Sequence, residues 1–198
     1  MTAPLFLFAP GAGAPSSSAW MQAWKARLAT LGDVETFDYP YMKAGRRMPD
    51  RQPALIAAHA EALAQARAAH PAAERVFLIG KSMGSRMGCH LSLQTTVTGL
   101  VCLGYPLISA SSGAKRDEVL LALRTPVLFV QGSNDELCPL PELEAVRAKM
   151  HAPNRLFVVQ GGDHSLEVSR ARSQRDAVEA SNATVLTEIR HFLENMTQ

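Results

Sequence analysis

Six runs of apolar residues, each of strand length, recur along the 198-residue chain. They are LFLFA (5–9), VETFDY (34–39), RVFLIG (75–80), GLVCLGY (99–105), PVLFVQG (126–132) and RLFVVQG (155–161). Five of them are almost continuously apolar, which is typical of strands that are covered on both faces of a sheet. The second run mixes apolar and polar residues, which favours a position at the edge of the sheet.

Helical patterns separate most of these runs. They cover residues 16–32, 52–71, 82–95, 116–123, 140–150 and 177–196, with serines, prolines or a glycine at several of their ends. Alternating strands and helices predict a parallel sheet with right-handed crossovers and helices on both faces. We therefore expect one α/β domain over residues 1–198, with about six strands and a functional site at their carboxyl ends.

Composition and charge exclude several classes of partner. The chain is 47% hydrophobic and 19% charged, which is typical of a globular protein. Its formal net charge is only +2 and no basic stripe is interleaved with aromatic residues, so we expect no nucleic-acid partner. No apolar run approaches the roughly 20 residues that span a bilayer, and no basic residue precedes the first run as in a signal peptide. We expect a cytoplasmic protein without a membrane partner.

The cysteine pattern argues against a disulfide framework and against a metal site. The chain has 3 cysteines, which is an odd number, and none of them forms a C-x-x-C pair. Such a pattern fits reduced thiols in an intracellular protein. We expect neither a metal nor another cofactor.

The segment RVFLIGKSMGSRMG (75–88) is compatible with two kinds of site. A Walker-type phosphate loop requires a glycine where the chain has Arg75, and its loop residues would be a buried apolar strand. A G-x-S-x-G turn between a strand and a helix is instead the pattern of a nucleophile elbow, in which the serine has a strained backbone. The segment therefore predicts Ser82 as a nucleophile, with Gly80 and Gly84 small enough to let strand and helix approach each other.

A base and an acid for this serine follow later strands. Asp135 follows the fifth run and His164 follows the sixth, so that all three residues fall at the carboxyl edge of the predicted sheet. Their order along the chain is the one that a Ser–Asp–His triad takes on such a sheet. Asp163 and Glu136 are alternative carboxylates, whose side chains we expect to diverge from the base. We interpret the remaining histidines as structural or solvent-exposed: His59, His70, His90, His151 and His191.

The loop after the first run, APGAGAPSS, has two interpretations. As a dinucleotide-binding motif it is imperfect, because Ser16 replaces the third glycine and Pro15 lies inside the turn. Asp38 could nevertheless take the place of the acid that binds ribose.

The alternative is that this loop supplies part of an oxyanion hole. One amide would come from Ala12 or Gly13, of which we favour Ala12, and the other from Met83, the residue after the nucleophile. Further residues are candidates for lining the substrate site: Gly11, Gly13, Lys81, Tyr105 and Cys138.

Five segments resemble motifs of the α/β-hydrolase superfamily: PGAGA, DYPYMKAGRRMPDR, GKSMGSR, QGSNDELCP and GGDHSL. The resemblance spans nearly the whole chain and is strongest to short dienelactone-hydrolase-like members and to a second group of small relatives, some of which serve in larger assemblies. It implies a three-layer α/β-hydrolase fold with Ser82 as nucleophile, Asp135 as acid and His164 as base. Dienelactone hydrolases proper have a cysteine as nucleophile, so the serine argues against their substrate. Residues 107–124 hold one short helical stretch, which is too little for a cap domain, so we expect an open, lidless site.

These patterns predict a serine hydrolase, namely a carboxylesterase that acts on small to medium esters through an acyl-enzyme. The same residues could cleave thioesters or peptides, and a non-catalytic interaction protein with this fold is the alternative from another class. The cationic loop at 41–51, with Lys81, Arg86 and the segment 169–175, could favour an acidic substrate. Its arginines could instead form surface ion pairs, which is the interpretation we favour.

Overall fold

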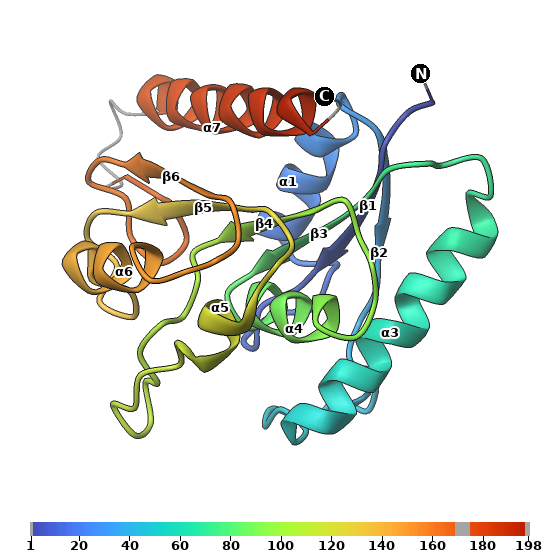
Figure 1. Ribbon diagram of the computed structural model, residues 1–198, viewed down its shortest axis with the longest axis horizontal. Helices are drawn as coiled ribbons and strands as arrows, with labels where there is room; N and C mark the ends of the chain where they lie inside the picture. The colour runs from blue at the N-terminus through green and yellow to red at the C-terminus, as the bar shows by residue number, and fades with distance from the viewer. Residues whose placement is uncertain (1, 169–174, 197–198) are drawn as a thin grey trace.

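The computed structural model describes residues 2–168 and 175–196 of the chain. Within these residues it contains a six-stranded sheet in which every pair of neighbouring strands is parallel. The strand order is β2-β1-β3-β4-β5-β6 (Figure 1). The strands are β1 (Leu5–Ala9), β2 (Asp33–Thr36), β3 (Val76–Lys81), β4 (Gly99–Leu103), β5 (Val127–Gly132) and β6 (Asn154–Val159). The predicted parallel sheet is confirmed, and the mixed second run forms an edge strand.

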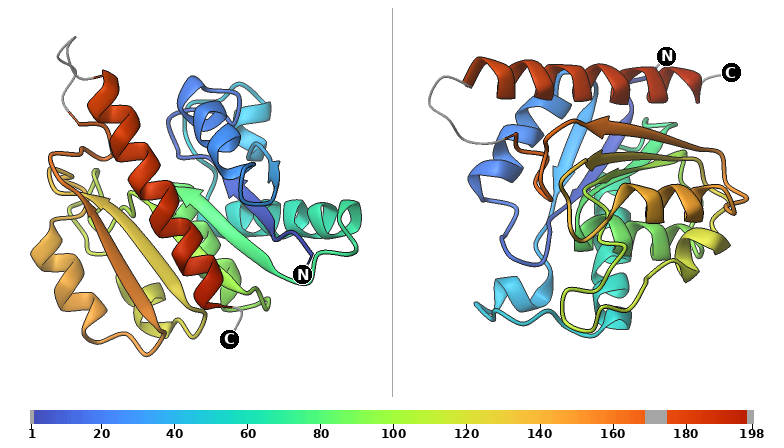
Figure 2. Two further views of the ribbon diagram at one scale, coloured as in Figure 1. Left: turned by 90° about the horizontal axis from the view of Figure 1, so that it is seen from above. Right: turned by 90° about the vertical axis from the view of Figure 1, so that its left-hand side faces the viewer.

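Helices cover both faces of the sheet, as predicted. They are α1 (Ala19–Leu28), α2 (Pro40–Lys43), α3 (Gln52–Ala69), α4 (Met83–Ser92), α5 (Glu118–Ala122), α6 (Leu140–Arg147) and α7 (Arg175–Asn195). Helices α1 and α7 pack on one face, whereas α3, α4, α5 and α6 pack on the other (Figures 1 and 2). The result is a three-layer α/β fold with the sheet in the middle.

Alternating side chains of each strand supply the two cores. In β1, Leu5 and Leu7 point towards the face covered by α3 to α6, and Phe6 and Phe8 towards the face covered by α1 and α7. Because both faces are covered, the central strands contain apolar residues in succession and not in alternation with polar ones. This explains why periodicity along these runs is weak although the runs themselves are easy to recognise.

The connection after β2 differs from the prediction. The run predicted at 34–39 leaves the sheet after Thr36, and Tyr39 immediately precedes the short helix α2, which the sequence pattern did not indicate. Pro40 occupies the first turn of α2, where a missing amide hydrogen costs nothing. The chain therefore turns over the carboxyl edge of the sheet earlier than expected.

The segment between β4 and β5 forms no cap domain. Between Gly104 and Pro126 it contains α5, which has 5 residues, and an isolated bridge between Ile108 and Lys115. The prediction of a lidless fold is thereby confirmed. Among the described residues, no helix has the length and apolar character needed to cross a membrane. The basic segment at 169–175 lies outside the described residues, apart from the start of α7.

Candidate active site

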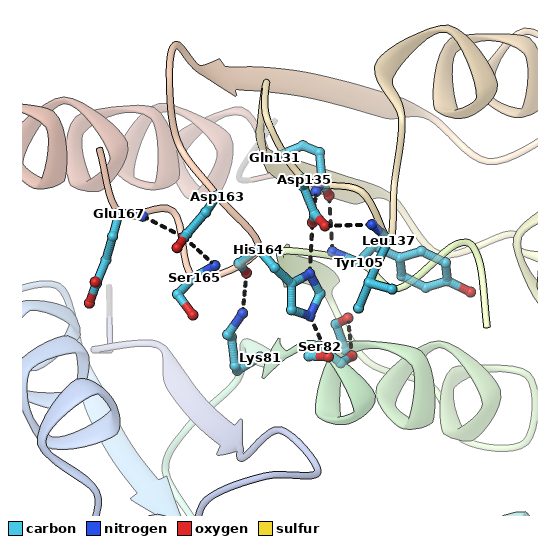
Figure 3. A network of polar contacts seen from close by, with 11 residues as sticks. Lys81, Ser82, Tyr105, Gln131, Asp135, Leu137, Asp163, His164, Ser165 and Glu167 are labelled. Carbon is cyan, nitrogen blue, oxygen red and sulfur yellow. Dashed lines mark hydrogen bonds and ion pairs between the residues drawn. The ribbon is translucent and has the colours of Figure 1, made fainter. Parts of the chain in front are cut away.

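Three side chains from separate strand ends meet at the carboxyl edge of the sheet. Ser82 follows β3, Asp135 lies in the loop after β5, and His164 lies in the loop after β6. The Oγ of Ser82 lies 2.8 Å from Nε2 of His164, and Nδ1 of His164 lies 2.7 Å from Oδ2 of Asp135. Figure 3 shows the imidazole between the hydroxyl and the carboxylate, pointing to both. The three side chains thus form one continuous hydrogen-bonded series.

The serine lies on a strained turn that only small neighbours permit. Ser82 has φ 49° and ψ −115°, and α4 begins at the next residue. A Cβ on Gly80 would lie 2.2 Å from the amide nitrogen of Ser85, and one on Gly84 would lie 2.5 Å from the carbonyl oxygen of Ala9. Both distances are too short for any side chain, so these glycines allow β1, β3 and α4 to close around the turn. A strained residue of this kind costs about 1–3 kcal/mol, which the surrounding packing must offset.

The carboxylate of Asp135 is fully buried and is held by several donors. Its Oδ1 accepts a hydrogen bond from the backbone amide of Leu137 at 2.8 Å. Its Oδ2 accepts one from the imidazole of His164 and one from the side-chain amide of Gln131. The Oε1 of Gln131 in turn accepts the amide of Tyr105 at 3.0 Å. Because a buried carboxylate is costly unless it is hydrogen-bonded, this arrangement stabilises the charge in one orientation. With Nδ1–H donated to this carboxylate, Nε2 is free to accept a proton from the hydroxyl.

Two residues outside the series hold the loop that carries the histidine. Lys81 donates from Nζ to the carbonyl oxygen of His164, and Trp20 donates from its indole nitrogen to the carbonyl oxygen of Ser165 at 2.9 Å. The Nζ of Lys81 also lies 5.4 Å from the centre of the Trp20 ring, which is a cation–π distance. Burial lowers the pKa of Lys81 to about 8, although the negative charges of Asp135 and other carboxylates raise it in part. This lysine therefore supports the loop and places its amino group close to Ser82.

The alternative carboxylates do not compete for the imidazole. The Oδ1 of Asp163 accepts hydrogen bonds from the backbone amides of Ser165 at 2.7 Å and Glu167 at 3.1 Å. These bonds close a tight turn away from the imidazole of His164 (Figure 3). Glu136 is exposed to solvent. Neither side chain forms the hydrogen bond to the imidazole of His164, which Asp135 accepts.

A cavity of about 420 Å³ opens beside Ser82 and His164. Of the predicted lining residues, Gly11, Gly13 and Lys81 contribute to it, and so does Ala12. The other lining residues are Ala14, Ser18, Trp20, Met21, Leu137, Ser165 and Glu167.

Tyr105 and Cys138 do not line this cavity, contrary to their proposed place in the site. Both side chains are completely buried in the core on the α3 to α6 face. The hydroxyl of Tyr105 donates to the carbonyl oxygen of Arg116 at 3.0 Å, so its ring lies below the site. Burial, and then the charge of Asp135, raises the pKa of the Cys138 thiol to about 12. Tyr105 acts on the site only through its backbone amide, which orients Gln131.

Both predicted oxyanion donors belong to segments that lie next to Ser82. Met83 is the first residue of α4, so its amide has no acceptor inside the helix, and its side chain is buried away from the cavity. The loop after β1 passes close to Ser82, because a Cβ on Gly11 would lie 3.5 Å from the Cβ of the serine. Ala12 follows in that loop, and its amide donates to no other group that the structure describes. Oxyanion binding by Met83 and Ala12 stays a prediction.

The cationic loop makes some of the surface contacts that we favoured. Arg46 pairs with Asp50 at 2.7 Å, and Arg86 donates to Oε1 of Gln52 at 2.8 Å, which ties α4 to α3. Arg46 and Arg47 also line a second cavity of about 430 Å³ on the other side of the 11–15 loop.

Sequence reasoning missed Gln131 and Trp20. Gln131 could have been found, because it is a polar residue at the end of an otherwise apolar strand that must be covered on both faces. Trp20 carries no comparable signal, since an aromatic residue in an amphipathic helix is ordinarily part of the core. Among the described residues, no group of three or more metal-ligating side chains gathers in one place.

Solved structures share this fold at low sequence identity. A dienelactone hydrolase from Anabaena variabilis is 16% identical with a TM-score of 0.70, covering 96% of this chain and 87% of that one. A chain from work on LipS and LipT, two metagenome-derived lipolytic enzymes, is 14% identical with a TM-score of 0.66, covering 93% and 94%. A serine hydrolase without a lid from Xanthomonas campestris is 14% identical with a TM-score of 0.64, covering 84% and 75%. At these identities the likeness concerns the fold alone.

The sequence itself matches the family model for the alpha/beta hydrolase domain over residues 2–194. That range includes all six strands, the strained turn at Ser82 and the loops that carry Asp135 and His164. The chain therefore belongs to the α/β hydrolase domain family.

Proposed function

We propose that this protein is a serine hydrolase that cleaves small to medium carboxylic esters. The observation that carries the proposal is the unbroken series from the hydroxyl of Ser82 through the imidazole of His164 to the carboxylate of Asp135, with contacts of 2.8 and 2.7 Å. A nucleophile, a base and a group that orients the base are the minimum that this chemistry needs.

In the first step His164 takes the proton of Ser82 as the oxygen attacks the ester carbonyl. The imidazole becomes a cation, and the adjacent carboxylate of Asp135 stabilises it without accepting the proton. The protonated imidazole then gives its proton to the departing alcohol, which leaves an acyl group on Ser82. In the second step water takes the place of the alcohol, and the same proton transfers release the acid.

Amides near the serine would stabilise the negative charge on the carbonyl oxygen. Met83 at the start of α4 and Ala12 in the loop after β1 are the proposed donors, and the N-terminus of α4 adds a favourable dipole. Each donor of this kind contributes about 3 kcal/mol to the transition state, because it is already oriented when the charge develops.

The cavity supports an ester with a modest apolar part. Its volume of about 420 Å³ lies in the range of small-molecule sites, and Trp20, Met21 and Leu137 give it apolar walls. The short segment between β4 and β5 carries no helices that could cover it. The dienelactone hydrolase and the lipolytic enzymes that share the fold are consistent with ester substrates.

The test is hydrolysis of p-nitrophenyl acetate and butyrate by the wild-type protein and by Ser82→Ala and His164→Ala. We expect each variant to lose at least about 10³-fold in kcat while retaining the wild-type circular dichroism and melting temperature. Unchanged turnover in either variant would contradict the proposal. A panel of acyl chain lengths, with matched thioesters and peptides, then defines the substrate class: the proposal expects the highest kcat/KM for oxygen esters with short to medium acyl groups.

A further inference from the structure

A buried tyrosine connects the loop after β2 to the loop beside the nucleophile. Tyr41 lies in α2 and is only 1% exposed. Its hydroxyl donates to the carbonyl oxygen of Ala12 at 2.9 Å. Ala12 belongs to the loop that lines the cavity together with Ser82, so this bond reaches the edge of the candidate active site.

This bond fixes the plane of one peptide. In a trans peptide the carbonyl and the next amide hydrogen point in opposite directions, so holding the carbonyl of Ala12 also orients the amide of Gly13. Tyr41 lines the second cavity and not the first, Ser82 lines the first and not the second, and residues 12–14 line both. The bond therefore holds a carbonyl dipole on the far side of the loop, away from the place where an oxyanion would develop.

Packing alone does not hold this part of the loop. Gly13 and Ala14 are exposed, and nothing lies within 4 Å of the Cβ position of Gly13. A glycine also permits either orientation of the neighbouring peptide, because it adopts positive φ readily. If the peptide turned over, the carbonyl of Ala12 would face the reacting oxygen and repel the negative charge that develops there in the transition state.

The tyrosine itself is held rigidly. Its ring stacks on Tyr39 with ring centres 6.4 Å apart and an angle of 15° between the planes. Both rings belong to one buried cluster with Leu55, Met83 and Met87. Met83 carries the other proposed oxyanion amide, so the same cluster supports both sides of the predicted oxyanion hole. Burial, and then the charges of Asp50 and Asp38, raises the pKa of Tyr41 to about 12, so its hydroxyl remains a donor at neutral pH.

We propose that Tyr41 is a positioning residue for the oxyanion hole, because its hydroxyl holds the Ala12–Gly13 peptide so that the loop presents amides, and not a carbonyl, to the reacting oxygen. This inference rests on the proposed hydrolase function. Tyr41 acts through the loop and touches no reacting atom. Its loss should therefore cost less than the about 10²–10³-fold that follows removal of a donor itself.

The test is a pair of matched variants, Tyr41→Phe and Tyr39→Phe. Each removes one buried hydroxyl from the same stacked pair, but Tyr39 contacts Nδ1 of His59 at 3.3 Å and not the loop. For Tyr41→Phe we expect a fall of about 10-fold in kcat for p-nitrophenyl acetate, with KM within about twofold of wild type. The rate at which a fluorophosphonate labels Ser82 should fall by a similar factor, since that reaction also creates charge on an oxygen. Tyr39→Phe should retain both rates, and melting temperatures of both variants report any general loss of packing.

Equal kcat values for the two variants, or a rise in KM with unchanged kcat in Tyr41→Phe, would overturn the inference but leave the proposed function intact if Ser82→Ala remains inactive. A wild-type protein that neither turns over esters nor labels at Ser82 would overturn both.

Discussion

Gly104 faces the carbonyl oxygen of His164 so closely that a Cβ on this glycine would lie 2.5 Å from that oxygen. The glycine follows β4 and has φ +65°, a conformation that other residues rarely adopt. It therefore leaves room for the loop that carries the base and for the Nζ of Lys81, which would lie 3.2 Å from the same Cβ position.

Gly104→Ala should displace the imidazole of His164. A shift of about 1 Å in a catalytic group can cost about 100-fold, so we expect a loss of that order in kcat/KM for p-nitrophenyl acetate. The matched control is Gly113→Ala, because Gly113 has φ +66° and open space at its Cβ position. Both variants incur a backbone strain of about 1–2 kcal/mol, but only the first should lose activity. Equal activities in the two variants would show that this contact does not position the base.

Asp135→Asn should retain the fold and lose catalysis. An amide at this position would no longer stabilise the imidazolium and would favour the wrong tautomer of His164, so we expect kcat to fall by about 10³–10⁴-fold. Glu136→Gln removes an adjacent but exposed carboxylate and should leave kcat unchanged. The measurements are steady-state kinetics and melting temperatures of both variants. An equal fall in kcat for Asp135→Asn and Glu136→Gln would assign the effect to net charge and not to the orientation of the base.

His59 should make the protein sensitive to acid. Its side chain is completely buried, and burial lowers its pKa to about 3. In the unfolded chain the pKa is near 6.5, so between these values the unfolded state binds a proton that the folded state does not, and stability falls as pH decreases through this window. From pH 7.5 to pH 5 this single group should cost about 2 kcal/mol of unfolding free energy.

The variant His59→Asn should remove that dependence. The hydroxyl of Tyr39 contacts Nδ1 of His59, and an asparagine side chain can still form a hydrogen bond to it. Asparagine has no counterpart of Nε2, which has no hydrogen-bond partner among the described residues. Urea unfolding at both pH values should show the smaller loss for this variant, whereas Tyr39→Phe, which keeps the imidazole, should follow the wild type. The account of His59 is wrong if His59→Asn and the wild type lose the same free energy between pH 7.5 and pH 5.

The strands and the chemistry at their ends were predictable because both depend on local signals. A buried parallel strand is a short continuous apolar run, and the turn around Ser82 requires small residues at fixed spacing. That His164 lies between Ser82 and Asp135 required only that these strands be parallel, because their carboxyl ends then share one edge.

Contacts between loops were not predictable in this way. Tyr105 and Cys138 follow strand ends as Ser82, Asp135 and His164 do, but their side chains turn down into the core. Tyr41 and Ala12 are 29 residues apart, and no spacing along the chain reveals the hydrogen bond between them. The direction of a side chain at a strand end depends on the three-dimensional packing below it, and the pattern of residues in a single sequence does not predict that packing.

Labelling with a fluorophosphonate followed by mass spectrometry tests most directly whether Ser82 is an activated nucleophile. We predict one adduct per wild-type chain, mapped to the peptide that contains Ser82, no adduct in Ser82→Ala, and labelling slowed by at least about 10³-fold in His164→Ala. An unmodified wild-type protein, an adduct on a different residue, or equal labelling rates in wild type and His164→Ala would contradict the account.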